Sequence, residues 1–165
     1  MTSASTTSGT AEDRVDRAVG VLLGQAVGDA LGVPYEFATP PGPGEHAAML
    51  GGGLGDFAPG EWSDDTAMAV AVAEGLLAAR QGGGSVEDEI ATRFLAWYAS
   101  GPADIGNQTA AVLGATARAL AGAEAGAAPG ATMRREAQAF ALDHPHSAGN
   151  GALMRTGVVA LVHLH

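Results

Sequence analysis

The sequence predicts a compact, multi-helix, all-α fold, and three observations support this prediction. Apolar residues recur at helical spacing over long stretches, and segments rich in glycine and proline separate those stretches. No stretch alternates polar and apolar residues in the way that a half-buried β-strand does. A chain of 165 residues, 47% of them hydrophobic, is long enough for one domain with a core and too short for two comfortable domains.

The first helix is predicted from the apolar residues that begin at Val15, and it should end at Gly32 and Pro34. Glycines recur every fourth residue along one ridge of this helix, at positions 20, 24, 28 and 32. Each interior glycine costs roughly 0.5–1 kcal/mol relative to alanine. We therefore expect another backbone to approach this ridge closely. The glycine- and proline-rich segment 38–60 follows, and a connection of this length is usually functional or disordered.

Five further helices are predicted, at about 64–80, 86–99, 108–121, 131–142 and 151–164. The last of them shows neither a cap nor a stop signal. We therefore expect residues 13–165 to be the N-terminal portion of a domain that is truncated on its C-terminal side. The start of the chain is rich in serine and threonine, and we expect residues 1–12 to be a flexible tail.

Composition and charge exclude several classes of protein. A net charge of -10 argues against binding to nucleic acid or to an anionic membrane, because both need basic surfaces. The absence of cysteine excludes disulfides and thiolate metal sites, and it fits a cytoplasmic protein. The start of the chain does not have the pattern of a signal peptide, and no run of 18 apolar residues occurs. We expect no membrane partner.

The segment Ser63-Asp64-Asp65-Thr66 places two carboxylates directly before a long apolar run. One interpretation is a helix start in which Ser63 is the cap and both acids favour the positive end of the helix dipole. The other is a hard-cation site, because a serine oxygen and two carboxylates suit Mg²⁺ or Mn²⁺. The two interpretations are compatible, because a rigid helix start would hold metal ligands well.

Two more acids, Asp29 and Glu36, lie near the end of the first helix. Asp29 falls in the last helical turn, where the helix dipole disfavours a negative charge by roughly 0.3–1 kcal/mol. An arginine, a metal or a hydrogen-bonded network should therefore offset its charge. Glu36 follows Pro34 in a turn; it is either an ordinary exposed glutamate or, beside a metal, a candidate acid or base.

The turn Gly149-Asn150-Gly151 opens directly into the last predicted helix. It is either a tight turn in which Asn150 caps the helix, or an anion site made by free backbone N–H groups. Asn107 is interpreted first as a helix cap and second as a ligand.

Four motifs occur in a fixed order: GVLLGQAVGDALGVPYEF, EWSDDTAM, DIGNQTAAVLGA and HSAGNGALMR. Together, from about Arg17 to the end of the chain, they resemble the ADP-ribosylglycohydrolase family. The resemblance implies a compact all-α domain with two Mg²⁺ ions, which cleaves the glycosidic bond between ADP-ribose and an acceptor on a protein or a small molecule.

The resemblance also implies residue roles. Ser63, Asp64 and Asp65 would be metal ligands, and Glu36 would be the catalytic carboxylate. Residues Gly149, Asn150 and Gly151 would line the ADP-ribose pocket, and Asp29 would support the site.

The sequence departs from the family pattern in one respect, because it contains no later Asp-x-Asp-Thr segment to complete the metal site. We therefore expect half an active site, completed by a C-terminal half or a complementing chain. Two alternatives stay open. One is a non-catalytic, ADP-ribose-binding or partner-dependent half-domain, and the other is a hydrolase of another ribosylated small molecule.

Overall fold

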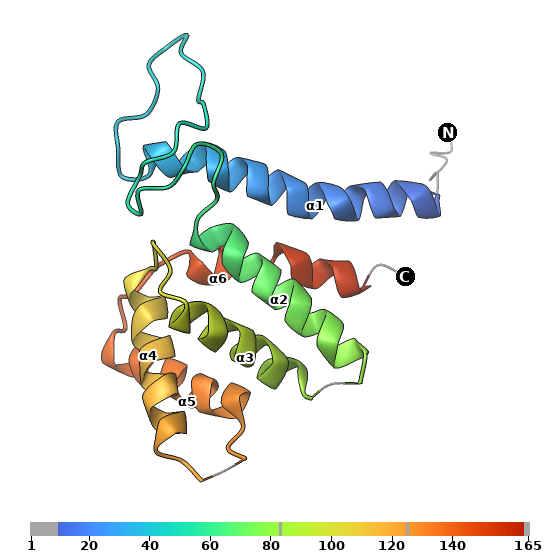
Figure 1. Ribbon diagram of the computed structural model, residues 1–165, viewed down its shortest axis with the longest axis vertical. Helices are drawn as coiled ribbons and strands as arrows, with labels where there is room; N and C mark the ends of the chain where they lie inside the picture. Colours follow the sequence, from blue (N-terminus) through green and yellow to red (C-terminus); the bar gives the residue numbers. More distant parts are fainter. Residues whose placement is uncertain (1–9, 83, 125, 164–165) are drawn as a thin grey trace, which may run out of the picture.

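The computed structural model describes residues 10–82, 84–124 and 126–163, and these residues form a helical assembly (Figure 1). The elements in chain order are α1 (Ala11–Gly32), the 3₁₀ turn η1 (Val33–Tyr35), α2 (Asp64–Arg80), α3 (Val86–Ala99), α4 (Asn107–Ala121), α5 (Pro129–Asp143), α6 (Gly151–Met154) and the 3₁₀ segment η2 (Gly157–His163). No β-strand occurs in the described part of the chain, where an isolated antiparallel bridge joins Gly52 to Phe57. The predicted all-α class is confirmed.

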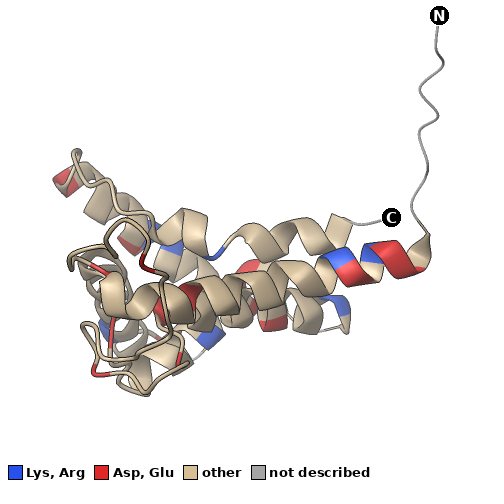
Figure 2. Ribbon diagram, turned by 90° about the horizontal axis from the view of Figure 1, so that it is seen from above, with Lys and Arg blue, Asp and Glu red and all other residues tan. Residues whose placement is uncertain are grey.

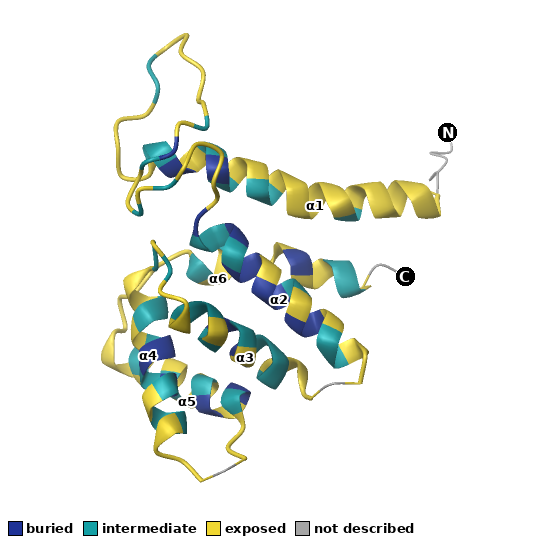
Figure 3. Cartoon of the chain, in the orientation of Figure 1, coloured by how far each residue is buried: buried dark blue, intermediate teal, exposed yellow. Residues whose placement is uncertain are grey.

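The core is built around α2, which carries more buried residues than any other element (Figure 3). Met68 of α2 is fully buried, and it clusters with Phe94 of α3, Leu113 of α4 and Val158 of η2. A single central helix therefore brings three other elements into one core, and its first turn is held beside them.

Helix α1 begins at Ala11, two residues before the predicted start of the folded portion, and Thr10 and Asp13 form a capping box there. Its charged residues gather at the N-terminal end, and a long apolar stretch follows (Figure 2). By length and composition alone the segment Ala11–Tyr35 could cross a membrane, because its most apolar window has a mean hydropathy of 1.2. Only 11% of that window is buried, but Gln25 and Asp29 on this segment hydrogen-bond residues at the start of α2 and in α6.

The glycine ridge of α1 does not have the close neighbour that its spacing predicts. A Cβ atom placed on any of its four glycines would meet no atom within 4 Å among the described residues. The close approach occurs elsewhere. A Cβ on Gly75 of α2 would lie 2.6 Å from Cγ1 of Ile90, so that α2 and α3 pack together through this glycine.

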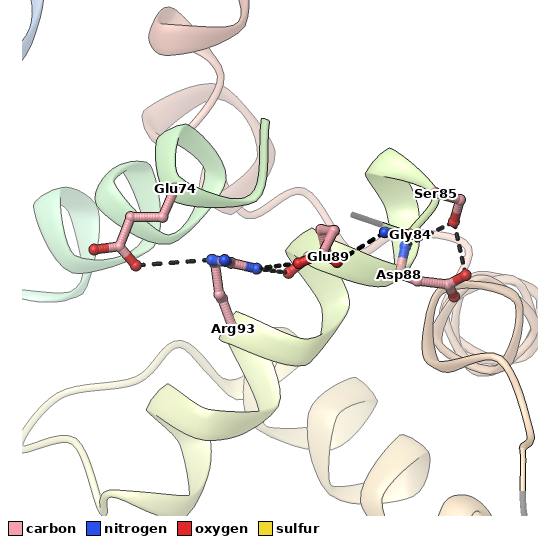
Figure 4. A network of polar contacts seen from close by, with 6 residues as sticks. All are labelled: Glu74, Gly84, Ser85, Asp88, Glu89 and Arg93. Carbon is pink, nitrogen blue, oxygen red and sulfur yellow. Dashed lines mark hydrogen bonds and ion pairs between the residues drawn. The ribbon is translucent and has the colours of Figure 1, made fainter. Parts of the chain in front are cut away.

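The start of α3 is fixed by a network of polar contacts (Figure 4). Ser85 accepts a hydrogen bond from the Asp88 amide, and the Gly84 amide donates to the Glu89 carboxylate at 3.0 Å. Arg93 joins Glu89 at 2.7 Å and reaches Glu74 of α2 at 3.8 Å. One carboxylate oxygen of Asp88 accepts a hydrogen bond from the Ser85 hydroxyl. The other accepts a hydrogen bond from the Gly130 amide, which anchors the start of α5.

The prediction of one continuous helix over 151–164 is wrong. Helix α6 ends at Met154, and the chain resumes as η2 from Gly157 to His163. At the break, the Thr156 hydroxyl donates to the Leu153 carbonyl. The Val159 amide donates to the Thr156 carbonyl, three residues back, and not to the carbonyl four residues back as in an α-helix. Periodicity alone does not reveal such a break, because the apolar spacing continues through it.

Candidate functional site

A cavity of about 1160 Å³ lies where the end of α1 meets the starts of α2 and α4 and the segment that leads into α6. All eight residues that the sequence singles out for the site line this one cavity. They are Asp29, Glu36, Ser63, Asp64, Asp65, Gly149, Asn150 and Gly151. The fold thus brings together segments that are more than 100 positions apart in the chain.

Asp29 joins the end of α1 to the start of α2. Its carboxylate accepts hydrogen bonds from the Ser63 amide at 3.0 Å, from the Ser63 hydroxyl at 2.7 Å and from the Thr66 amide at 2.9 Å. These amides are among the unpaired donors of the α2 N-terminus, so Asp29 caps α2 from another helix. A hydrogen-bonded network therefore offsets the charge of Asp29, which is one of the three possibilities that the sequence left open.

Ser63 occupies the N-cap position of α2, but its side chain accepts no capping hydrogen bond. Ser63 thus holds the predicted N-cap position, but the capping hydrogen bonds are accepted by Asp29 and not by the Ser63 side chain. Its hydroxyl donates its proton to Asp29, and the lone pairs of its oxygen remain available. The buried Ser63 is held in place by Asp29 rather than by its own helix.

Three carboxylates near this helix start, those of Glu36, Asp64 and Asp65, have raised pKa values. Burial raises the pKa of Asp65 to about 6, with further contributions from the charges of Asp29, Asp64 and Asp104. The pKa of Asp64 is raised by burial and then by Asp104, and the pKa of Glu36 is raised by burial and then by the surrounding acids. Burial disfavours the charged form of a carboxyl group, and neighbouring like charges add to that effect.

The donor set at the start of α2 fits a hard divalent cation in part. Asp64, Asp65 and Ser63 offer oxygen ligands, which Mg²⁺ prefers, and they lie on a helix start that is fixed by Asp29. Within the described ranges, however, no group of three or more histidine or carboxylate side chains is arranged as a metal cage. The residues present supply a partial set of ligands, and the identity of the metal stays a prediction.

The turn 149–151 lies on the same cavity, beside α4. The Ser147 hydroxyl donates to the Gln108 side chain at 3.1 Å, which ties the segment before the turn to α4. Asn150 occupies the N-cap position of α6 without a capping side-chain bond. The predicted cap at Asn107 is wrong, because Gly106 holds that position and Asn107 is the first residue of α4.

Three residues of the site were not predicted from the sequence. Asp104 lies in the DIGN motif, three residues before Asn107, and Arg155 ends the GNGALMR motif; both line the cavity. Gln25 donates one hydrogen bond to the Asp65 carbonyl at 3.0 Å and one to the Met154 carbonyl at 2.8 Å, so it links α2 to α6. Asp104 and Arg155 could have been noticed in the sequence, because both are charged residues within the recognised motifs. Gln25 gives no such signal, because its role depends on the tertiary fold alone.

Comparison with known proteins identifies the family. The family model described as ADP-ribosylglycohydrolase matches residues 10–165. The chain belongs to the ADP-ribosylglycohydrolase family. The family that the four sequence motifs suggest is thereby confirmed.

Individual members of the ADP-ribosylglycohydrolase family are similar to the chain over only part of their length. An ADP-ribosylarginine hydrolase Tri1 of Pseudomonas putida is 34% identical over 94% of this chain and 38% of its own length. An ADP-ribosyl-[dinitrogen reductase] glycohydrolase of Rhodospirillum rubrum is 43% identical over 56% of this chain and 32% of its own length. A Tri1 protein of Serratia proteamaculans is 32% identical over 87% of the chain and 36% of its own length. The chain thus spans about a third of the length of the relatives that it matches.

Proposed function

We propose that the protein acts in the hydrolysis of the glycosidic bond between ADP-ribose and an acceptor side chain, with a divalent cation held at the start of α2. One observation carries the proposal: five carboxylates from three separate segments, at residues 29–36, 64–65 and 104, line one cavity. The names of the relatives support the reaction class, because each of those quoted above is a hydrolase or glycohydrolase of an ADP-ribosyl group.

Asp64, Asp65 and the Ser63 oxygen would hold the cation, and Asp29 would fix their helix in place. A bound Mg²⁺ or Mn²⁺ would supply charge stabilisation and would orient oxygen groups at the anomeric carbon. The cation would also offset the acidic charge of the cavity, which otherwise repels an anionic substrate. Further oxygen ligands would have to come from water or from a segment outside this chain.

Glu36 would move the proton. It lies at the end of η1, exposed at the cavity, and its carboxylate has a raised pKa because of burial and the surrounding acids. A carboxylate that holds its proton more readily is suited to general acid or base catalysis, which is worth typically 10²–10⁴-fold in rate. Hydrolysis would form the bond from the water oxygen to the anomeric carbon, break the bond to the acceptor atom, and pass the water proton through Glu36 to the leaving group.

The test is the release of ADP-ribose from an ADP-ribosylated arginine protein, with Mg²⁺ and with EDTA. We expect Mg²⁺-dependent release that falls by about 10²-fold or more in Glu36→Gln. Glu45→Gln is the matched control, because Glu45 is exposed in the same long loop and does not line the cavity. Full release by Glu36→Gln would contradict the role of Glu36, and binding of ADP-ribose without any release would favour a non-catalytic binding module.

A further inference from the structure

Arg155 is a cationic side chain in a cavity whose charged lining residues are mostly acidic. It caps the C-terminal end of α6 and is half-buried. One of its Nη atoms lies 3.3 Å from the Met68 sulfur, and its guanidinium carbon lies 5.1 Å from the centroid of the Phe94 ring. Because Met68 and Phe94 are both buried in the core, they hold the guanidinium plane in a fixed place at the cavity wall.

The charge of Arg155 has no ion-pair partner among the described residues. No carboxylate of the described ranges lies within ion-pair distance of its guanidinium, whereas Arg134, which also lines the cavity, pairs with Glu87. A guanidinium has five N–H donors, and the Met68 sulfur is a weak acceptor for one of them. Arg155 has no other hydrogen bond to a described residue, so most of its donors are available to a ligand in the cavity.

The position of Arg155 also has an electrostatic cost. Burial lowers the pKa of Arg155, and the charge of Asp64 opposes that effect. An aliphatic side chain would pack on Met68 and Phe94 without this cost, because it carries no charge to desolvate. Packing alone therefore does not account for an arginine at this position, whereas an anion bound in the cavity does.

We propose that Arg155 binds the phosphate groups of the substrate and so determines specificity for a phosphorylated ligand. The inference rests on the proposed function, since it takes the anion to be the diphosphate of ADP-ribose. The planar fork of arginine matches phosphate oxygens in a bidentate geometry. The neighbouring turn leaves room for such a ligand, because Gly151 carries no side chain beside the guanidinium. The cavity would thus hold phosphate at Arg155 and the reacting ribose at the acidic cluster.

The test compares two ligands that differ in charge, ADP-ribose and adenosine, by calorimetric titration of the full chain at constant Mg²⁺. We expect wild type to bind ADP-ribose more tightly than adenosine. In Arg155→Gln the affinity for ADP-ribose should fall by about tenfold or more, because charge-assisted hydrogen bonds are lost, while the affinity for adenosine stays within about twofold. The loss should shrink as the salt concentration rises.

Two further variants separate recognition from folding. Arg155→Met keeps an apolar stem against Met68 and Phe94, and it should show the same selective loss. Arg134→Gln is the matched control, because Arg134 lines the cavity but is already paired with Glu87. Its affinity for ADP-ribose should stay within about twofold of wild type.

Three results would overturn the inference: unchanged ADP-ribose affinity in both Arg155 variants, an equal loss of adenosine affinity, or a wild type without preference for ADP-ribose. Selective binding through Arg155 without release of ADP-ribose from a modified protein would support this inference and contradict the proposed hydrolysis. Mg²⁺-dependent release that is unaffected by both Arg155 variants would support hydrolysis and contradict the inference.

Discussion

At the scale of single residues, the site depends on the contacts of Asp29. Its carboxylate accepts three hydrogen bonds from Ser63 and Thr66, and it thereby fixes the first turn of α2, where Asp64 and Asp65 lie. The sequence predicts that the charge of Asp29 must be offset and that Ser63 begins a helix. It does not predict that Asp29 and Ser63 bind each other, because residues 34 positions apart meet only in the tertiary fold.

Replacing Asp29 should therefore destabilise the protein more than replacing an ordinary surface acid. In Asp29→Ala the amides of Ser63 and Thr66 lose a charged acceptor, and we expect the free energy of unfolding to fall by about 1–3 kcal/mol. Urea denaturation measures this difference. Asp16→Ala on the exposed part of α1 is the control, and an equal effect of both substitutions would contradict the capping role.

The raised pKa of Asp65 predicts a pH dependence of stability in EDTA. The folded pKa of about 6 lies above the ordinary value of 3.8, so between these values the folded state binds more protons than the unfolded state. Stability should therefore fall as the pH rises from about 4 to about 6. Urea denaturation at several pH values should show a smaller fall for Asp65→Asn, and an identical pH profile of variant and wild type would contradict this account.

At the scale of elements, the periodicity of apolar residues predicts most of the helices. The structure places α2 at Asp64–Arg80 and α3 at Val86–Ala99, with the predicted bounds, because both helices combine a clear apolar pattern with a clear start signal. The last helix was predicted wrongly, because a change to 3₁₀ geometry leaves the apolar pattern intact. The position of the close helix contact could not be predicted either, because the sequence does not reveal which glycines meet another backbone.

Two glycine substitutions test that distinction. Gly75→Ala should destabilise the protein by about 1–3 kcal/mol, because the new Cβ would lie within 3 Å of both the side chain and the backbone of Ile90. Gly24→Ala in α1 meets no described atom within 4 Å, and it should stabilise the helix by roughly 0.5–1 kcal/mol. Thermal unfolding of the two variants measures both effects. Destabilisation by Gly24→Ala would indicate that α1 has a close neighbour which the described residues do not supply.

At the scale of the whole molecule, one cavity collects the motifs that are spread along the chain. The order of these motifs predicts the family, and the composition predicts a folded helical protein. The shared cavity itself could not be predicted in detail, because its walls come from helices α1 to α6 and the segments between them, and their relative placement depends on packing around Met68. For the same reason the unpaired charge of Arg155 becomes apparent only in the structure.

The central claim is that the start of α2 binds a divalent cation, and calorimetric titration with Mg²⁺ tests it most directly. Wild type should bind Mg²⁺, and the double variant Asp64→Asn, Asp65→Asn should lose that binding. The double variant Asp16→Asn, Asp143→Asn removes the same charge from exposed positions, and it should bind Mg²⁺ as wild type does. Equal Mg²⁺ binding by the two double variants would contradict the claim, because the cation would then respond to net charge alone.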